Sequence, residues 1–318
     1  MDLYLQSFIF TADIVAPIFF IVFLGYLLKR CHLLDDAFIT TSSKLVFIVT
    51  LPILVFMSIS RTDFHAVFNP QQLGFVVGGT FISFIAVWMI AKHWIKKPED
   101  LGVFIQGTFR SNYGIIGLAV SFNLFSDSGL AQASILLALV IPLFNILSII
   151  ALTIPAHRSG SSNLSSTIKE IIKNPLIIAV LLALPFSYLN IQLPELVQKT
   201  GRYFANLTLP LALLAIGATL NLASLRNTSA PATWATVIKL VIMPLTLTAA
   251  AWLYGFHGQE LTLLMILFGC PTAAASFVMA KAMGGNSELA ANIILMTTLG
   301  SVLTLSGGIY IMRVLGVI

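Results

Sequence analysis

The sequence predicts an all-α membrane protein with ten transmembrane helices. Hydrophobic residues make up 58% of its 318 residues, charged residues make up only 9%, and the mean hydropathy is +0.97. Charged residues form about a quarter of an ordinary soluble domain, so this composition excludes one. The apolar stretches are continuous and do not alternate in polarity, which excludes a closed β-barrel.

Each predicted span is an apolar run of roughly the 20 residues that cross a bilayer, bounded by polar residues or by glycine and proline. The first run could be mistaken for a signal peptide. However, Asp2 and Asp13 precede it and Lys29 and Arg30 follow it, so we expect a retained helix. The ten runs are 14–30, 41–60, 72–95, 101–125, 130–155, 173–190, 194–220, 231–256, 260–283 and 287–315.

The longest connection, residues 156–172, is rich in serine and separates five spans from five. We expect a first five-helix repeat over 1–155, a cytoplasmic linker loop over 156–172, and a second repeat over 173–318. Because each half has an odd number of spans, related halves must lie in the membrane with opposite orientations. Such inverted repeats are typical of secondary transporters, with the site near the midplane where the halves meet.

Short matches at a constant offset of 158 residues support this repeat. Thr50-Leu51-Pro52 recurs as Thr208-Leu209-Pro210, and Pro17 recurs as Pro175. Mid-span helix breakers also occur in both halves. The fourth span contains Ser111-Asn112-Tyr113-Gly114, and the ninth contains Gly269-Cys270-Pro271-Thr272 followed by Ala273 to Ser276. These residue types weaken helices, so we expect broken helices at 110–114 and 269–273 that face a cavity.

Lysine and arginine predict the orientation, because short cytoplasmic loops collect them. Eleven lie in or beside the loops after the odd-numbered spans, and four lie on the opposite face. This asymmetry puts both termini outside the cytoplasm. It also accounts for the net charge of +5 without a nucleic-acid partner. The eleven are Lys29, Arg30, Lys44, Lys92, Lys96, Lys97, Arg158, Lys169, Lys173, Arg226 and Lys281; the four are Arg61, Lys199, Arg202 and Arg313.

Arg110 is a guanidinium inside the fourth apolar run. It follows Leu101 by nine positions, which places it roughly 15 Å along a helix and near the middle of a ~30 Å hydrocarbon core. All twelve acidic residues lie in loops or at span ends, so no carboxylate at membrane depth is available to neutralise it. A structural role remains one interpretation, but the cost of at least ~3 kcal/mol at this depth favours a water-lined cavity and an anion-binding or charge-compensating role.

The neighbouring polar residues allow two interpretations each. Asn112 and Tyr113 either bind a carboxylate or cap the broken helix. Asn206 and Thr208, near Pro210, either line the site or satisfy backbone groups freed by the proline, and Thr272 and Ser276 are similar. Four others favour interhelical hydrogen bonds: Asn145, Asn292, Thr297 and Thr298.

Four segments resemble the auxin efflux carrier family, and together they span most of the chain. They are SKLVFIVTLPILVFMSIS (43–60), GTFRSNYGIIGLAV (107–120), RYFANLTLPLALLAIGATL (202–220) and GCPTAAASFVMAKAMGG (269–285). The resemblance implies an inverted 5+5 repeat with broken spans 4 and 9 that cross at the midplane, as in the related bile acid:sodium symporters. It also implies organic anion substrates, commonly dicarboxylates. Ser111-Asn112 fits the family pattern, whereas Arg110 departs from it.

The sequence therefore predicts a secondary transporter of mono- or dicarboxylates in a bacterial inner membrane, working by alternating access. The expected substrate-binding residues are Arg110, Ser111, Asn112, Tyr113, Asn206, Thr208, Pro271, Thr272 and Ser276. A metabolite sensor built like a transporter and an anion channel are the alternatives. The expected partners are the small anion and the lipid bilayer, and a homodimer is compatible with the sequence.

Catalytic and metal chemistry find no support. No intramembrane acidic pair, His-Glu-x-x-His or Gly-x-Ser-x-Gly motif occurs, so we expect no enzyme activity and no catalytic residues. The five histidines fall in loops or at span ends, and the two cysteines, Cys31 and Cys270, imply no disulfide framework. No cofactor or metal is expected.

Overall fold

A computed structural model describes residues 2–61, 68–155, 175–220, 222 and 229–318 of the chain. Within these ranges the chain forms helices and no strand; Ser111 and Thr272 make an isolated antiparallel bridge. The predicted all-α class is therefore confirmed for this part of the chain. The predicted linker loop, 156–172, lies outside the described residues.

The helices of the first half follow the predicted apolar runs. Polar caps begin two of them: Asp35 accepts a hydrogen bond from the Phe38 amide at 2.6 Å, and Asn69 accepts from the Gln71 amide at 2.9 Å. Two elements, η1 and η2, are π-helical turns. The elements are α1 (Asp2–Arg30), α2 (Asp36–Leu45), η1 (Val46–Thr50), α3 (Leu51–Ser60), α5 (Pro70–Trp94), α6 (Pro98–Phe109), η2 (Tyr113–Gly117) and α7 (Leu118–Thr153).

The helices of the second half include a third π-helical turn, η4. The elements are α9 (Pro175–Tyr188), α10 (Glu195–Thr219), α11 (Ala230–Val237), η4 (Ile238–Ile242), α12 (Met243–Tyr254), α13 (Gly258–Gly269), α14 (Ala275–Ala282) and α15 (Ser287–Val314).

Two predicted boundaries differ from the structure. Helix α1 begins at Asp2 and not at residue 14, because its polar residues fit a helix; the Thr11 hydroxyl, for example, donates to the Ser7 carbonyl at 2.8 Å. Helix α7 runs through the predicted gap at 126–129, between the fourth and fifth runs, but its backbone is interrupted there: Ser126, with φ 52° and ψ −138°, is non-helical and marks a kink.

In the described part of the chain, six helical stretches are long and apolar enough to cross a membrane. They are 4–30, 36–60, 70–94, 113–153, 230–254 and 287–314, and shorter apolar helices cover 177–188 and 258–269. Helix α10 is continuous over the seventh predicted run but is not among the six. It carries Lys199, Arg202 and Asn206, which make it less apolar. The architecture is that of a multi-pass membrane protein.

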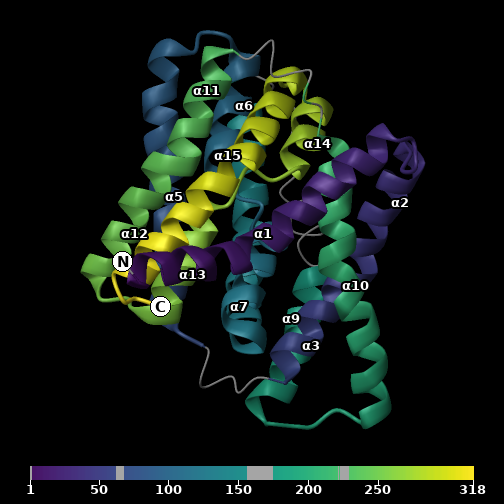
Figure 1. Cartoon of the computed structure of the whole chain (residues 1–318). Coiled ribbons are helices and arrows are strands. Elements are labelled where there is room, and N and C mark those ends of the chain that lie inside the picture. Colours follow the sequence, from purple (N-terminus) through teal and green to yellow (C-terminus); the bar gives the residue numbers. More distant parts are fainter. Residues whose placement is uncertain (1, 62–67, 156–174, 221, 223–228) are drawn as a thin grey trace.

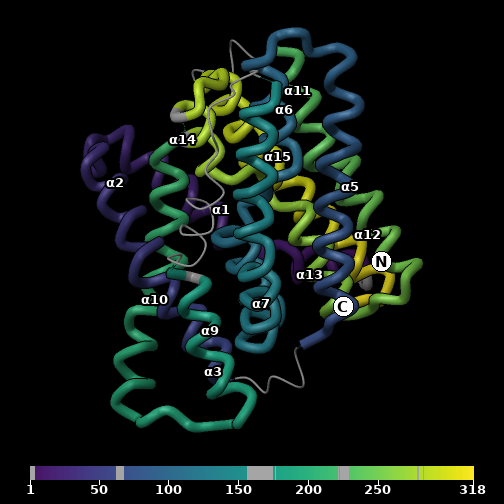
Figure 2. The backbone as a smooth tube through the Cα atoms, turned by 180° about the vertical axis from the view of Figure 1, so that it is seen from behind, coloured from purple at the N-terminus to yellow at the C-terminus, as the bar shows by residue number. Residues whose placement is uncertain are grey.

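The helices gather into two groups, which Figure 1 and Figure 2 show from opposite sides. Helices α2, α3, α9 and α10 form one group, and α5, α6 and α11 to α15 form the other. Helices α1 and α7 contact both groups. The backbones of α1 and α10 approach closely at two glycines. A Cβ at Gly25 would overlap the carbonyl oxygen of Leu214, and one at Gly217 would overlap that of Val22.

Candidate functional site

Two interrupted helices meet at the centre of the second group. Helix α6 ends at Phe109, and regular backbone resumes only at Tyr113. Helix α13 ends at Gly269, and α14 begins at Ala275. The interruptions, residues 110–112 and 270–274, are called the crossing segments below. They agree with the predicted breaks at 110–114 and 269–273, except that 113–114 belong to the π-helical turn η2 and that the second interruption begins and ends one residue later.

The crossing segments satisfy each other's backbone groups. The Asn112 amide donates to the Pro271 carbonyl at 2.7 Å, and the Ala273 amide donates to the Arg110 carbonyl at 3.3 Å. These bonds flank the Ser111–Thr272 bridge. Backbone groups freed by a helix break must find partners inside the protein when no water is available. The sequence-predicted residues Arg110, Ser111, Asn112, Pro271 and Thr272 are therefore brought together.

Thr272 also ties the crossing to neighbouring helices. Its amide donates to the Thr297 hydroxyl of α15 at 3.1 Å, and its own hydroxyl donates to the Gly107 carbonyl of α6 at 2.5 Å. Thr297 thus makes the interhelical hydrogen bond expected of it. These hydrogen bonds connect the second crossing segment to α15 and to the end of α6.

Arg110 follows α6 directly and is 9% exposed. Its guanidinium donates to the Asn145 side-chain oxygen at 3.0 Å and to the Ser148 hydroxyl at 3.1 Å, and one amino nitrogen lies 2.9 Å from the Met279 sulfur. Asn145 therefore contacts this arginine across helices. The Nε atom is buried and has no hydrogen-bond partner among the described residues. All of the observed partners are neutral.

Lys239 is a second buried cation beside the crossing. It lies in η4 and is 0% exposed. Its ammonium donates to the Ser111 hydroxyl at 2.5 Å and to the Phe268 carbonyl at 3.2 Å. The sequence analysis did not single out this residue. The signal was nevertheless present, because Lys239 is a lone charge inside the run 231–256.

Neither buried cation has a carboxylate partner in the described ranges. The ion pairs found there are Lys29–Asp36, Arg61–Asp127 and Lys199–Glu195. Asp127, one of the loop carboxylates with which Arg110 could have formed a structural ion pair, pairs with Arg61 instead. The crossing therefore carries two positive charges against oxygen and sulfur atoms that bear no formal charge.

The remaining predicted residues are distributed differently. Tyr113 and Ser276 are buried next to the crossing segments, and the Ser276 hydroxyl has no hydrogen-bond partner among the described residues. Thr208 is buried in α10, and its hydroxyl donates to the Phe204 carbonyl at 3.2 Å. Asn206, two residues earlier, is exposed and lines a separate pocket. Helix α10 contacts the turn η2, which directly follows the first crossing segment.

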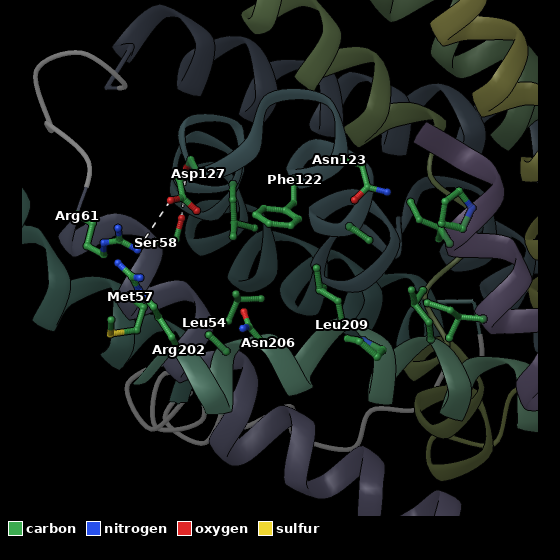
Figure 3. A pocket seen from close by; sticks show the side chains of 18 residues that line it. Leu54, Met57, Ser58, Arg61, Phe122, Asn123, Asp127, Arg202, Asn206 and Leu209 are labelled. Atoms are coloured by element: carbon green, nitrogen blue, oxygen red, sulfur yellow. Dashed lines mark hydrogen bonds and ion pairs between the residues drawn. The ribbon is translucent and has the colours of Figure 1, made fainter. Parts of the chain in front are cut away.

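This separate pocket, called the outer pocket below, lies between α1, α3, α7 and α10 and has a volume of about 510 Å³. Figure 3 shows Arg61 and Arg202 at one end of it, with Asp127 beside Arg61 and Asn206 farther along. The Arg61 guanidinium lies 3.8 Å from the Asp127 carboxylate. The other lining residues are Pro17, Ile18, Ile21, Leu54, Met57, Ser58, Ala119, Phe122, Asn123, Leu130, Ala205, Leu209, Pro210 and Leu213.

Comparison with known proteins covers almost the whole chain. A family model described as "Membrane transport protein" matches residues 10–309. An uncharacterized transporter of Methanothermobacter thermautotrophicus is 24% identical over 298 residues, covering 93% of this chain and 96% of that protein. The uncharacterized transporter YfdV of Escherichia coli K12 is 25% identical over 312 residues, covering 96% and 98%.

A third relative carries a substrate in its name. The Rhizobium meliloti protein named "Putative malonate transporter" is 31% identical over 146 residues, which is 46% of each chain. The similarity to this protein therefore covers about half of the chain, whereas the two relatives above match it nearly from end to end.

Proposed function

Because the chain belongs to the auxin efflux carrier family of membrane transport proteins, whose members here are transporters and not enzymes, we propose that it carries small organic anions, mono- or dicarboxylates. The observation that carries this proposal is the buried Arg110 guanidinium, which has only neutral partners. A charge at this depth costs at least ~3 kcal/mol on insertion scales. A carboxylate at the crossing would offset that cost. The name of the Rhizobium relative supports a dicarboxylate.

The helix amino termini at the crossing favour an anion as well. The turn η2 begins at Tyr113 and α14 begins at Ala275, and neither start has a side-chain cap. Uncapped amino termini present backbone N–H groups and partial positive charge, which bind carboxylates. We assign the carboxylate contacts to Arg110, Asn112 and these two termini, with Ser111, Tyr113, Pro271, Thr272 and Ser276 shaping the site.

We further propose that ten spans form an inverted 5+5 repeat, with residues 1–155 and 173–318 as its halves and 156–172 as a cytoplasmic linker. The two helix breaks support this, because they occupy nearly equivalent positions when the two halves are aligned at the offset of 158 residues. A pair of contacts supports it independently. The Ser128 hydroxyl lies 3.3 Å from the Gln259 side-chain oxygen, and the Asn286 amide donates to Asp100 at 2.7 Å. The repeat relates these two contacts to each other. Residues 128 and 286 are 158 positions apart, and residues 100 and 259 are 159 positions apart.

In this arrangement the outer pocket is the non-cytoplasmic entrance, and Asn206 and Thr208 belong to α10, which lines it. The excess of lysine and arginine on the odd-numbered loops supports termini outside the cytoplasm. The pocket is lined by two positive charges, on Arg61 and Arg202, and by one negative charge, on Asp127, so it attracts anions. Relatives from Escherichia coli and Rhizobium meliloti support a location in a bacterial inner membrane.

Binding and transport test the proposal in turn. Purified protein is screened by thermal shift against mono- and dicarboxylates with malonate included, because a ligand of the folded state raises its melting temperature. Stabilising compounds are then supplied in radiolabelled form to sealed proteoliposomes. We expect saturable uptake of a compound that also stabilises the protein, and an excess of the unlabelled compound should compete.

The same measurements separate the alternatives. Stabilisation by a carboxylate without uptake would indicate a sensor, and unitary conductance in a planar bilayer would indicate a channel. If no organic anion either stabilises the protein or enters the vesicles, the proposed function is wrong.

A further inference from the structure

Lys239 is buried where a membrane protein rarely places a charge. It lies in the apolar stretch Ala230–Tyr254 and is fully covered by protein. The π-helical turn η4 around it contains Ile238–Ile242. Such turns insert an extra residue into a helix and often occur at functional sites, because they redirect a side chain. Here the redirected Lys239 side chain reaches the crossing.

The ligands of the Lys239 ammonium are oxygen atoms from both interrupted helices. Ser111 belongs to the first crossing segment, and its hydroxyl accepts one hydrogen bond. Phe268 belongs to the last turn of α13, and its carbonyl accepts another. Carbonyls at a helix carboxyl end carry partial negative charge. Half-helix carboxyl ends and unwound backbone are the places where secondary transporters coordinate a coupling cation.

Arg110 occupies the corresponding end of the other half-helix. It directly follows Phe109, where α6 ends, so a basic residue accompanies each of the two half-helices that end at the crossing; of the two, Lys239 donates to a carbonyl at its half-helix end. The Arg110 guanidinium itself extends toward α7 and α14, where it contacts Asn145, Ser148 and Met279. Arg110 also keeps a buried donor, Nε, without a partner. This difference leaves Arg110 available to a substrate, whereas Lys239 is committed to the protein.

We propose that the Lys239 ammonium is a built-in counter-cation that takes the place of a free coupling cation, so that binding and transport of the anion require no sodium. The inference rests on the proposed carrier function. A tethered cation stabilises the half-helix end and the neighbouring anion in the same way as a bound sodium ion, but it does not dissociate. The driving force then comes from the anion gradient and the membrane potential.

The first test replaces sodium around the wild-type protein. Uptake of the stabilising carboxylate is measured in proteoliposomes with sodium, potassium or choline salts at a clamped membrane potential. We expect equal uptake in all three. Faster uptake on a sodium gradient would overturn the inference while leaving the carrier function intact, whereas absence of any uptake would reject the carrier function itself.

The second test compares two neutral substitutions of different size. Lys239→Ala and Lys239→Met both remove the charge, and each should lower uptake by about tenfold or more, because hydrogen bonds to a charged group are strong. Only Ala leaves space for an external cation. We therefore expect sodium or methylammonium to restore uptake by Lys239→Ala but not by Lys239→Met.

Two further variants serve as controls. Lys239→Arg keeps a charge and should retain more uptake than Lys239→Met, and Arg110→Ala should not respond to added cations. Size-exclusion profiles and melting temperatures without ligand establish that each variant is folded. Should Lys239→Ala not fold, Lys239→Met decides: wild-type uptake by this neutral variant would overturn the inference, and loss of uptake in a folded protein would support it.

Discussion

The crossing and the outer pocket each hold two cations, but in opposite surroundings. Arg110 and Lys239 are buried and have neutral hydroxyl, amide, carbonyl and sulfur partners. In the outer pocket, the Arg61 side chain is 35% exposed and lies near Asp127, and Arg202 is exposed. Water and salt screen exposed charges and leave buried ones almost unscreened. Substitutions at the crossing should therefore have much larger effects than those in the outer pocket.

The largest effect is expected from adding an acid beside Arg110. Asn145→Asp would place a carboxylate where the guanidinium now meets an amide oxygen at 3.0 Å. A substrate would then have to displace a buried ion pair, and breaking such a pair costs roughly 3–5 kcal/mol. Affinity measured by thermal shift or calorimetry should fall by about a hundredfold or more. Asn145→Leu, which adds no charge, is the matched control; equal losses in both variants would contradict a role for Arg110 in neutralising the anion.

Removal of the guanidinium comes next. Arg110→Ala should weaken carboxylate binding by about ten- to a hundredfold, because an ionic hydrogen bond contributes roughly 1.5–3 kcal/mol. Arg110→Lys keeps the charge but loses the planar two-pronged geometry, so its affinity should fall between wild type and Ala. Competition binding on detergent-purified protein measures all three. Unchanged affinity in Arg110→Ala would assign this residue a structural role.

A smaller effect is expected at Ser111. Ser111→Ala removes one of the two oxygens that accept from Lys239 and leaves the Phe268 carbonyl in place. Loss of one such partner costs roughly 1–3 kcal/mol. The melting temperature without ligand should therefore drop, and uptake should decrease less than in Lys239→Met. Ser111→Thr retains a hydroxyl and should remain close to wild type; a fully stable Ser111→Ala protein would show that this hydrogen bond contributes little.

The smallest effect is expected in the outer pocket. Asp127→Asn removes the partner of Arg61, and an exposed ion pair contributes about 0–1 kcal/mol. The free energy of unfolding should hardly change. Uptake at low ionic strength should rise slightly and lose this gain in high salt, because the pocket becomes more positive. Glu195→Gln, from the exposed pair with Lys199, is the control outside the pocket. A large loss of uptake in Asp127→Asn would contradict the proposed contrast.

Particular residues show how far sequence reasoning reached. Helix breaks at 110–114 and 269–273 were predicted from Ser, Asn, Gly and Pro, because these residue types act on their own backbone, and the observed interruptions at 110–112 and 270–274 lie within a residue or two of them. The depth of Arg110 was predicted from its distance along a helix. Lys239 obeys the same rule and lies deep in its own apolar run, but it was overlooked because the lysine and arginine counts considered only loops and span ends.

The α10 residues show what local patterns miss. Asn206 and Thr208 are two positions apart, so they point in different directions on a helix. Thr208 is buried and donates to the Phe204 carbonyl, whereas Asn206 lines the outer pocket. From the sequence, their position near Pro210 allowed both residues either to line the site or to satisfy backbone groups freed by the proline. The packing of α10 against α1 and α3 separates their environments.

Composition and hydropathy by themselves determined that this chain is a helical membrane protein, because a chain this apolar is stable only in a lipid bilayer. The helix breakers determined where its backbone is interrupted. Only the tertiary structure decided which groups meet there. Ser111 pairs with Thr272, Arg110 reaches Asn145 and Lys239 reaches Phe268, each between segments well separated in sequence. No local preference encodes such contacts, because they depend on how whole helices pack and which face each one buries.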